Sequence, residues 1–248
     1  MSVRIGITAS RRECGLQYLA YLCASLQQQT DLRKVVCLAE PGTEQVPDLR
    51  WIYNSERLGN WHNWLALAKH MLSSDDDTQA YLLCEDDVVF ATDALVRLTQ
   101  MLPAVLTVGS FGYLSLYTSG THKQRVRAPR GSLVLTCGKQ QAVCEHVKRL
   151  WGACAMVFTR ESLQAIVNHP KALSWQGLPE DAAHRHEHGT AAITGRDIII
   201  NEVTQALSLR SWFLRPSAVQ HIGEHSSLGN NQGLTTGRRS TDYAASLQ

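Results

Sequence analysis

The chain has 248 residues, enough for one α/β domain with a sizeable core. Hydrophobic residues make up 44% of it and charged residues 19%, which is ordinary for a globular protein. No apolar stretch approaches the ~18–20 residues that cross a bilayer, no signal-peptide pattern opens the chain, and the seven scattered cysteines form no C-x-x-C pair. We therefore expect no membrane span, free thiols and a cytoplasmic protein.

The net charge of +2 is unevenly distributed. The basic segment, Thr121–Arg149, holds seven of the 24 Lys and Arg residues but one of the 22 acidic residues, so its local charge is +6 and the rest of the chain carries −4. Such asymmetry indicates an anionic partner near this segment. The alternative is a basic surface loop that binds nothing.

Strand-like and helix-like runs alternate through the first half of the chain. The predicted strands are Val3–Thr8, Lys34–Leu38, Leu49–Tyr53 and an apolar run that begins at Tyr81. The predicted helices, with apolar residues at helical spacing, are Leu16–Gln28, Gly59–Leu72 and Asp93–Met101. This alternation predicts an α/β fold with a mostly parallel sheet that helices cover on both faces.

The second half of the chain is less regular. The predicted strands there are Tyr113–Tyr117, Ser132–Thr136, Cys154–Phe158, Trp212–Leu214 and Ala218–Ile222, and the predicted helices are Arg160–Asn168 and Asp197–Ser208. The chain becomes rich in Gly, Ser and Asn from Gly223 onwards. We predict a single domain over residues 1–229 and a flexible tail over residues 230–248.

Three consecutive acids, Glu85-Asp86-Asp87, lie between two apolar runs. The first run, from Tyr81, reads as a buried parallel strand, so the acids emerge at the carboxyl edge of the sheet, where open α/β folds bind ligands. Acids crowded there repel one another unless a cation is present, and oxygen ligands favour Mg²⁺ or Mn²⁺ over zinc. The alternative is a solvated turn.

Four other segments accompany the acidic triplet in a recognisable order: Asn54–Trp64, Trp151–Arg160, Gly195-Arg196-Asp197 and Pro216–Gly223. With the triplet in the place of a D-x-D motif, they resemble the GT-A-fold, nucleotide-sugar-dependent glycosyltransferases. The resemblance covers about Val3 to Gly229. It implies a Rossmann-like GT-A domain whose nucleotide-binding half is residues 1–101 and whose acceptor half is residues 102–229.

The resemblance implies a divalent metal, Mn²⁺ or Mg²⁺, held by Asp87 and by His221 from the C-terminal strand. Asp87, Glu85 or both are candidates for the carboxylate ligand; we favour Asp87 as the direct ligand and expect Glu85 to point to the other face. A hydrogen-bonded structural role is the alternative for His221. The family usually has a second acid beside its catalytic base, and Arg196 stands there instead. His184, His186 and His188 have no cysteine companion and a spacing that splays them apart on a helix, so we do not predict zinc.

The same resemblance implies a UDP-sugar donor, with UDP-glucose expected. Arginine suits its phosphates because the guanidinium binds them bidentately. Plain surface charge is the alternative for Arg11 and Arg12. The predicted donor-binding residues are Thr8, Ala9, Ser10, Arg11, Arg12, Arg57, Asn60, Asn63, Glu85 and Asp86.

Asp197 is the predicted general base, which takes the proton of the acceptor hydroxyl in an inverting transfer. Its position at the start of a helix also suits a cap, which is the structural alternative. If Asp197 is a cap, the base is to be sought among Glu180, Asp181 and Glu187.

The acceptor is predicted from charge. A hydroxymethylated pyrimidine in DNA, in a bacterial or phage-infected cell, suits the basic segment, and the predicted acceptor-binding residues are Lys123, Arg125, Arg127, Trp151 and Gly152. A bacterial surface polysaccharide or lipid-linked sugar is the alternative acceptor. Two other classes remain open, a nucleotidyltransferase and a catalytically silent module that binds a nucleotide sugar.

Overall fold

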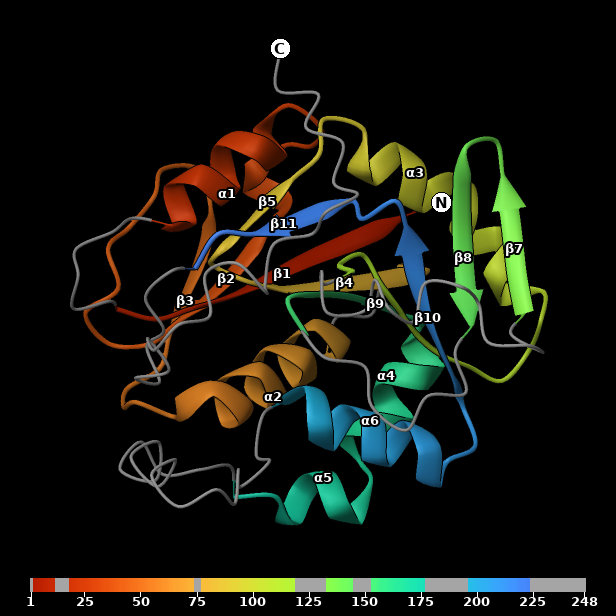
Figure 1. The fold of residues 1–248 in the computed structure, drawn as a ribbon. Coiled ribbons are helices and arrows are strands. Elements are labelled where there is room, and N and C mark those ends of the chain that lie inside the picture. The colour runs from red at the N-terminus through yellow and green to blue at the C-terminus, as the bar shows by residue number, and fades with distance from the viewer. Residues whose placement is uncertain are drawn as a thin grey trace, which may run out of the picture.

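A nine-stranded sheet runs through the centre of the molecule (Figure 1) in the computed structural model, which describes residues 2–11, 18–73, 77–118, 133–144, 153–176 and 196–223. Along the chain its strands are β1 (Val3–Ala9), β2 (Val36–Ala39), β3 (Arg50–Tyr53), β4 (Ala80–Glu85), β6 (Phe111–Ser115), β7 (Leu133–Cys137), β8 (Gln140–Cys144), β9 (Ala155–Phe158) and β10 (Arg210–Arg215). Their spatial order is β3-β2-β1-β4-β9-β6-β10-β8-β7.

Strands β8 and β9 run opposite to the other strands of this sheet, so the predicted mostly parallel α/β fold is confirmed. A small second sheet pairs β5 (Val88–Phe90) antiparallel with β11 (Val219–His221). The helices are α1 (Tyr18–Gln27), α2 (Gly59–Leu72), α3 (Ala94–Leu106), α4 (Arg160–Val167), α5 (Pro170–Ser174) and α6 (Arg196–Ala206), with a short 3₁₀ turn, η1 (Leu32–Lys34).

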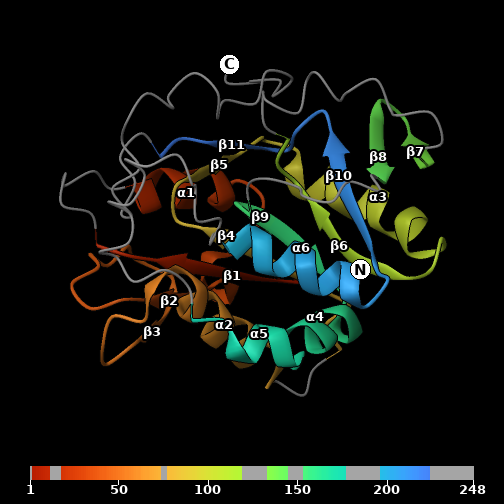
Figure 2. The ribbon, with the colours of Figure 1, turned by 60° about the horizontal axis from the view of Figure 1, so that its bottom comes forward.

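The helices cover both faces of the large sheet (Figures 1 and 2). Helices α1 and α3 and the small sheet lie on one face, and α2, α4, α5 and α6 lie on the other. Strand β4 contributes side chains to the hydrophobic cores on both faces of the sheet. Leu82 and Cys84 point into one core, and Tyr81 and Leu83 point into the other. This is why the run from Tyr81 is continuously apolar rather than alternating.

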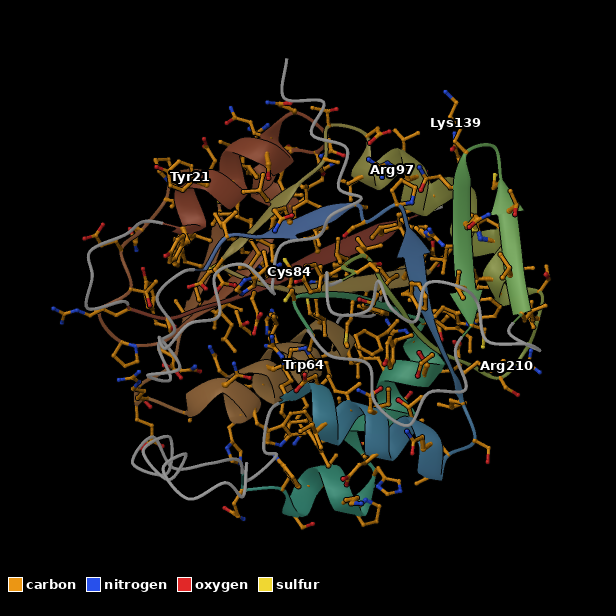
Figure 3. The ribbon with its side chains drawn as sticks, viewed as in Figure 1. Tyr21, Trp64, Cys84, Arg97, Lys139 and Arg210 are labelled. Carbon is orange, nitrogen blue, oxygen red and sulfur yellow. The ribbon has the colours of Figure 1, made fainter. Side chains whose placement is uncertain are left out.

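Aromatic residues fill the layer beneath the sheet. Trp64 of α2 is 1% exposed (Figure 3). Its ring stacks on that of Trp61 at 5.3 Å between centroids and meets the edge of Phe158 of β9 at 5.8 Å. These contacts anchor the helix that follows β3, because such pairs stabilise a core beyond their burial alone.

The structure also corrects several predicted elements. The predicted strand Ser132–Thr136 is present as β7, but the basic segment also contains the unpredicted strand β8, and the two form a hairpin. Helix α5 was not predicted either, and α3 continues past Met101 to Leu106 with Pro103 inside it. Buried Leu102 and Val105 hold this last turn against the sheet, which outweighs the missing proline donor. None of the described helices is long and apolar enough to cross a membrane.

Candidate functional site

The topology creates a switch point at the carboxyl edge of the large sheet. The chain runs outward from β1 to β2 and β3, then returns to place β4 on the other side of β1. Open α/β sheets bind ligands at this kind of crevice. The residues at the switch point are Thr8 on β1, which is in register with Glu85 on β4, and the turn Asp86-Asp87 that follows.

Asp86 turns towards β1. It is 6% exposed, and its Oδ2 accepts a hydrogen bond from the backbone N–H of Ser10 at 3.1 Å. The carboxylate therefore holds the backbone just beyond β1, within the segment predicted to bind the donor. Arg11 follows, exposed, with its side chain lying against Gly42: a Cβ built on that glycine would stand 3.1 Å from Arg11 Cδ.

Asp87 pairs with His221. The two side chains come from the β4–β5 turn and from β11, and Asp87 Oδ2 lies 3.2 Å from His221 Nε2. The backbone N–H of Ile222 donates to the Asp87 carbonyl at 2.8 Å, which fixes the two segments together. Two ligands at right angles on one ion, with bonds of ~2.1 Å, stand about 3 Å apart, so this spacing fits two ligands of one ion as well as a direct hydrogen bond.

Glycine at position 223 is required by this pair. A Cβ built there would lie 2.2 Å from Asp87 Oδ2, closer than atoms can approach, and 3.0 Å from His221 Cε1, which is a tight contact. The backbone after β11 therefore passes directly over the carboxylate, and no larger residue fits unless Asp87 moves.

We accordingly expect Gly223→Ala to weaken Mn²⁺ binding about 10–100-fold, the usual cost of disturbing the surroundings of a metal ligand. Titration of Mn²⁺ by electron paramagnetic resonance measures it. Gly138→Ala, at the β7–β8 turn where nothing lies within 4 Å of an added Cβ, controls for general backbone strain and should keep the wild-type affinity. Normal Mn²⁺ affinity in Gly223→Ala would mean that Asp87 is not a ligand or relocates without loss.

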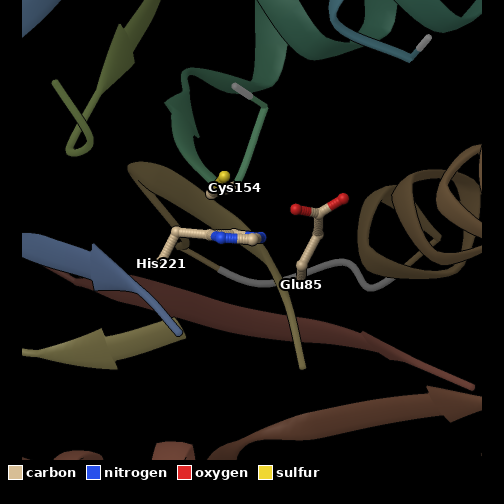
Figure 4. Close-up of side chains that lie close together, drawn as sticks. All are labelled: Glu85, Cys154 and His221. Atoms are coloured by element: carbon tan, nitrogen blue, oxygen red, sulfur yellow. The ribbon is translucent and has the colours of Figure 1, made fainter. Parts of the chain in front are cut away.

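Glu85 lies on the same side as His221, so the expectation that it points to the opposite face from Asp87 is wrong. One carboxylate oxygen of Glu85, Cys154 Sγ and a ring nitrogen of His221 all lie within 4.8 Å of one another (Figure 4). The strand ends at Glu85, and in the turn that follows Asp86 faces the Ser10 backbone while Asp87 faces His221. Cys154, which is among the described residues, was not predicted from the sequence to be a site residue.

Arg196, which replaces the second acid of the family pattern, forms a buried ion pair with Glu85. Its side chain is 3% exposed against 23% for Glu85. Its guanidinium also donates to the Ala153 carbonyl at 3.1 Å and to Thr8 Oγ1 at 3.4 Å. The first turn of α6 is thus attached to the ends of β1 and β4. The guanidinium of Arg196 holds the Glu85 carboxylate in place, and it is too deeply buried to reach a phosphate.

Three carboxylates are crowded at this edge, because Glu85, Asp86 and Asp87 are consecutive. Among the described residues, Arg196 forms an ion pair with Glu85, and His221 lies 3.2 Å from Asp87. Like charges so close together are costly in a half-buried site, and a divalent cation would lower this repulsion. The arrangement fits a resident M²⁺ ion.

Cys154 is a buried thiol facing two of these acids. Burial raises its pKa well above the ordinary value, and the charges of Glu85 and Asp87 raise it further, while Arg196 opposes them. The backbone around it is fixed, because Glu85 N–H donates to the Cys154 carbonyl at 2.9 Å. Without a metal ion the side chain is a neutral thiol at physiological pH.

The turn between β3 and α2 is organised by Glu40, a residue that sequence reasoning did not single out. Glu40 follows β2 and is 4% exposed, and its Oε1 accepts a hydrogen bond from Gly59 N–H at 2.7 Å. Its Oε2 lies 3.4 Å from Arg57 Nε. The only sequence signal was an acid at a strand end, before Pro41-Gly42.

Two asparagines predicted to bind the donor differ in their surroundings. Asn63 is 4% exposed, and its Oδ1 accepts a hydrogen bond from Asn54 Nδ2 at 2.9 Å. It therefore ties α2 to the end of β3. Asn60 is exposed in the first turn of α2. Ala9, buried at the end of β1, contributes its carbonyl to Glu40 N–H at 3.0 Å.

Asp197 lies in the first turn of α6, half-buried, next to Arg196. Its Oδ1 accepts a hydrogen bond from Ile198 N–H at 3.1 Å, and its carbonyl accepts one from Asn201 Nδ2 at 2.6 Å. The helix N-terminus stabilises its charged form. Both the base and the cap interpretation agree with this position.

Several predicted residues lie outside the described residues. They are Arg12, Lys123, Arg125, Arg127, Trp151 and Gly152, the alternative bases Glu180, Asp181 and Glu187, the histidines 184, 186 and 188, and the tail 230–248.

Known proteins resemble this chain in fold but not in sequence: no family profile and no curated protein matches it. GalNAc-T7, solved with UDP, GalNAc and Mn²⁺, superposes with a TM-score of 0.54 at 11% identity, over 88% of this chain and 42% of that one. Residues 1–349 of S. aureus TarS, in complex with UDP-GlcNAc, give 0.49 at 10% identity, over 91% and 62%. Mannosyltransferase PcManGT from Pyrobaculum calidifontis, with GDP-Man and Mn²⁺, gives 0.43 at 14% identity, over 65% and 46%.

These three solved chains are considerably longer, since this chain spans between 42% and 62% of their lengths. The likeness to GalNAc-T7 shows the fold alone: the chain has a Rossmann-like α/β fold of the GT-A type, as the sequence predicted.

Proposed function

We propose that the protein is a divalent-metal-dependent glycosyltransferase, which moves a hexose from a UDP-sugar to a hydroxyl group with inversion. The observation that carries this proposal is the Asp87–His221 pair beside Glu85, at the switch point of a GT-A fold. GalNAc-T7, which has the same fold, was solved with UDP, GalNAc and Mn²⁺, and this supports the choice of donor class and metal.

Asp87 and His221 would hold the metal. A nitrogen ligand favours Mn²⁺ over Mg²⁺, which prefers oxygen ligands only. A bound divalent ion neutralises the charge that grows on the leaving diphosphate. Arg196 keeps Glu85 in place and limits the repulsion among the three acids. We assign the ribose side of the donor to Glu85, whose side chain is the more exposed partner of that ion pair.

Two segments would bind the nucleotide. One contains Ser10 and Arg11 and is held by Asp86, and the other is the turn that contains Arg57 and is held by Glu40. Both segments follow strands whose carboxyl ends lie at the same edge of the sheet. Arg11 and Arg57 are exposed there, so their guanidinium groups can reach a phosphate.

Asp197 is proposed as the general base. The acceptor oxygen would attack the anomeric carbon while its proton passes to the Asp197 carboxylate. The bond from that carbon to the diphosphate oxygen breaks, and its electron pair leaves with UDP. Inversion follows because attack and departure occur on opposite faces of the sugar. The ion pair between Arg196 and Glu85 supports this role, because it ties the first turn of α6 to the metal side of the site.

The acceptor proposal remains the anionic one: a hydroxymethylated base in DNA. It rests on the charge of the basic segment alone. A duplex base would have to be flipped out before its hydroxyl could reach the site. A surface polysaccharide or lipid-linked sugar is the other acceptor class.

Neutralising Lys123, Arg125 and Arg127 together should weaken DNA binding and flatten its salt dependence, by roughly 0.9 units of slope for each lost phosphate contact. Fluorescence anisotropy over a series of salt concentrations measures this. An unchanged slope would remove the nucleic-acid role of the segment and favour the cell-surface acceptor.

A donor panel with a mass-spectrometric readout tests the proposed function. Hydroxymethylated DNA and simple glycans are incubated with UDP- and GDP-sugars and Mn²⁺. A hexose added to one acceptor is the expected product. Transfer of the whole nucleotide would instead establish a nucleotidyltransferase, and donor binding without any turnover would establish a silent binding module.

A further inference from the structure

The proposed site contains a ligand that neither a magnesium nor a manganese site requires: the thiol of Cys154. It comes from the turn just before β9, whereas Glu85 ends β4 and His221 ends β11. Three separate segments thus bring one sulfur, one oxygen and one nitrogen to within 4.8 Å of one another (Figure 4). Cys154 is 5% exposed.

This donor set has a clear chemical preference. Thiolate and imidazole select zinc and similar soft or borderline cations, whereas carboxylate oxygens alone suit Mg²⁺ and Mn²⁺. Tetrahedral ligands with bonds of ~2.0–2.3 Å stand roughly 3.5 Å apart, so shifts of about 1 Å would close the three groups around one ion. Such an ion would be four-coordinate if a water or a donor oxygen completed it.

His221 belongs to both groups of ligands. Its Nε2 lies 3.2 Å from Asp87 Oδ2, and one of its ring nitrogens lies within 4.8 Å of Glu85 and Cys154. A neutral imidazole has a lone pair for one cation only, because its other ring nitrogen carries a proton. A cation bound by the Cys154 sulfur and a cation bound by Asp87 therefore compete for His221, whichever nitrogen each of them uses.

We propose that this site binds a thiophilic divalent cation, Zn²⁺ or Co²⁺, through Cys154, Glu85 and His221, and that this binding displaces Mn²⁺ and inhibits transfer. The inhibitory part of this inference rests on the proposed function; the binding part does not. Coordination replaces the S–H proton of Cys154, which passes to solvent, and no electron is transferred.

Co²⁺ titration of the full-length, metal-stripped protein tests this directly. A thiolate bound to Co²⁺ absorbs in the near ultraviolet by charge transfer, which oxygen and nitrogen ligands do not produce. We expect this band in the wild type and in Cys144→Ser, a control at a buried thiol on β8, but not in Cys154→Ser. Zn²⁺ should abolish the band by displacing Co²⁺.

The same variants give a quantitative result. Removing the sulfur should lower Zn²⁺ affinity by at least about 10–100-fold, the range already seen for groups that merely support a ligand. Mn²⁺ affinity should stay within the wild-type range. In the wild type, X-ray absorption at the zinc edge should show one Zn–S distance of ~2.3 Å, so the inference can be tested even if Cys154→Ser does not fold.

The possible failures are distinguishable. Bound Co²⁺ without the charge-transfer band, or bound Zn²⁺ without a Zn–S distance, overturns this inference and leaves Mn²⁺-dependent transfer standing. The band without any Mn²⁺-dependent turnover supports the thiol site and contradicts the proposed function.

Discussion

Asp87→Ala should abolish both Mn²⁺ binding and sugar transfer. The substitution removes the only charged member of the Asp87–His221 pair and leaves an imidazole, a single neutral ligand, at the site. Losing a direct ligand should weaken Mn²⁺ binding by more than the ~10–100-fold that indirect changes produce. Electron paramagnetic resonance titration of Mn²⁺, in parallel with turnover, measures both effects.

Two matched variants separate coordination from simple charge. Asp87→Asn and Asp86→Asn each remove one negative charge from the same turn, but Asp86 faces the backbone N–H of Ser10 instead of His221. Mn²⁺ affinity should fall far more in Asp87→Asn than in Asp86→Asn. His221→Ala should act in the same direction as Asp87→Ala but more mildly. If both asparagine variants lost the same Mn²⁺ affinity, Asp87 would contribute only its negative charge and would not be a direct ligand.

The chemical step should fall by about 10²–10⁴ in Asp197→Asn, the usual share of a general base. Fold, metal affinity and donor affinity should all be retained, because asparagine caps a helix about as well as aspartate. The amide oxygen can still accept the hydrogen bond from Ile198 N–H. Single-turnover transfer, with excess enzyme over donor, isolates this step.

Glu202→Gln provides the control for Asp197→Asn. Glu202 lies on the same helix, α6, and pairs with Lys171 of α5. Its substitution removes one negative charge and should leave the transfer rate unchanged. If Asp197→Asn also transfers at a near-normal rate, Asp197 is only a cap, and the base must be sought elsewhere.

The large features of the fold could be predicted because they have local causes. Strand β4 is buried on both faces, so its sequence is a continuous apolar run that ends in the acids. Helix α2 begins and ends where its apolar spacing predicts, at Gly59 and Leu72. Strand β8 pairs with its neighbour β7 and with β10, which is distant in the chain, and the short run Gln140–Cys144 carried no signal of its own.

The site shows the same division. An acidic turn at the end of a buried strand predicts a ligand site. The order of the motifs predicts that His221 lies near Asp87, and the two side chains are in contact in the structure. The features that could not be predicted depend on contacts made in the three-dimensional fold. The Arg196–Glu85 ion pair, the Cys154 thiol beside Glu85 and the passage of Gly223 over Asp87 all join residues far apart in sequence.

The account depends on a metal-dependent transfer of the sugar rather than the nucleotide. Its most direct test is chromatography of the nucleotide released from UDP-glucose by wild type and Asp87→Ala, each with Mn²⁺ and with a chelator. We predict UDP from the wild type with Mn²⁺ only, and none from Asp87→Ala under either condition. Release of glucose 1-phosphate, with UMP either free or attached to the acceptor, or UDP release that survives both the chelator and the loss of Asp87, would contradict the account.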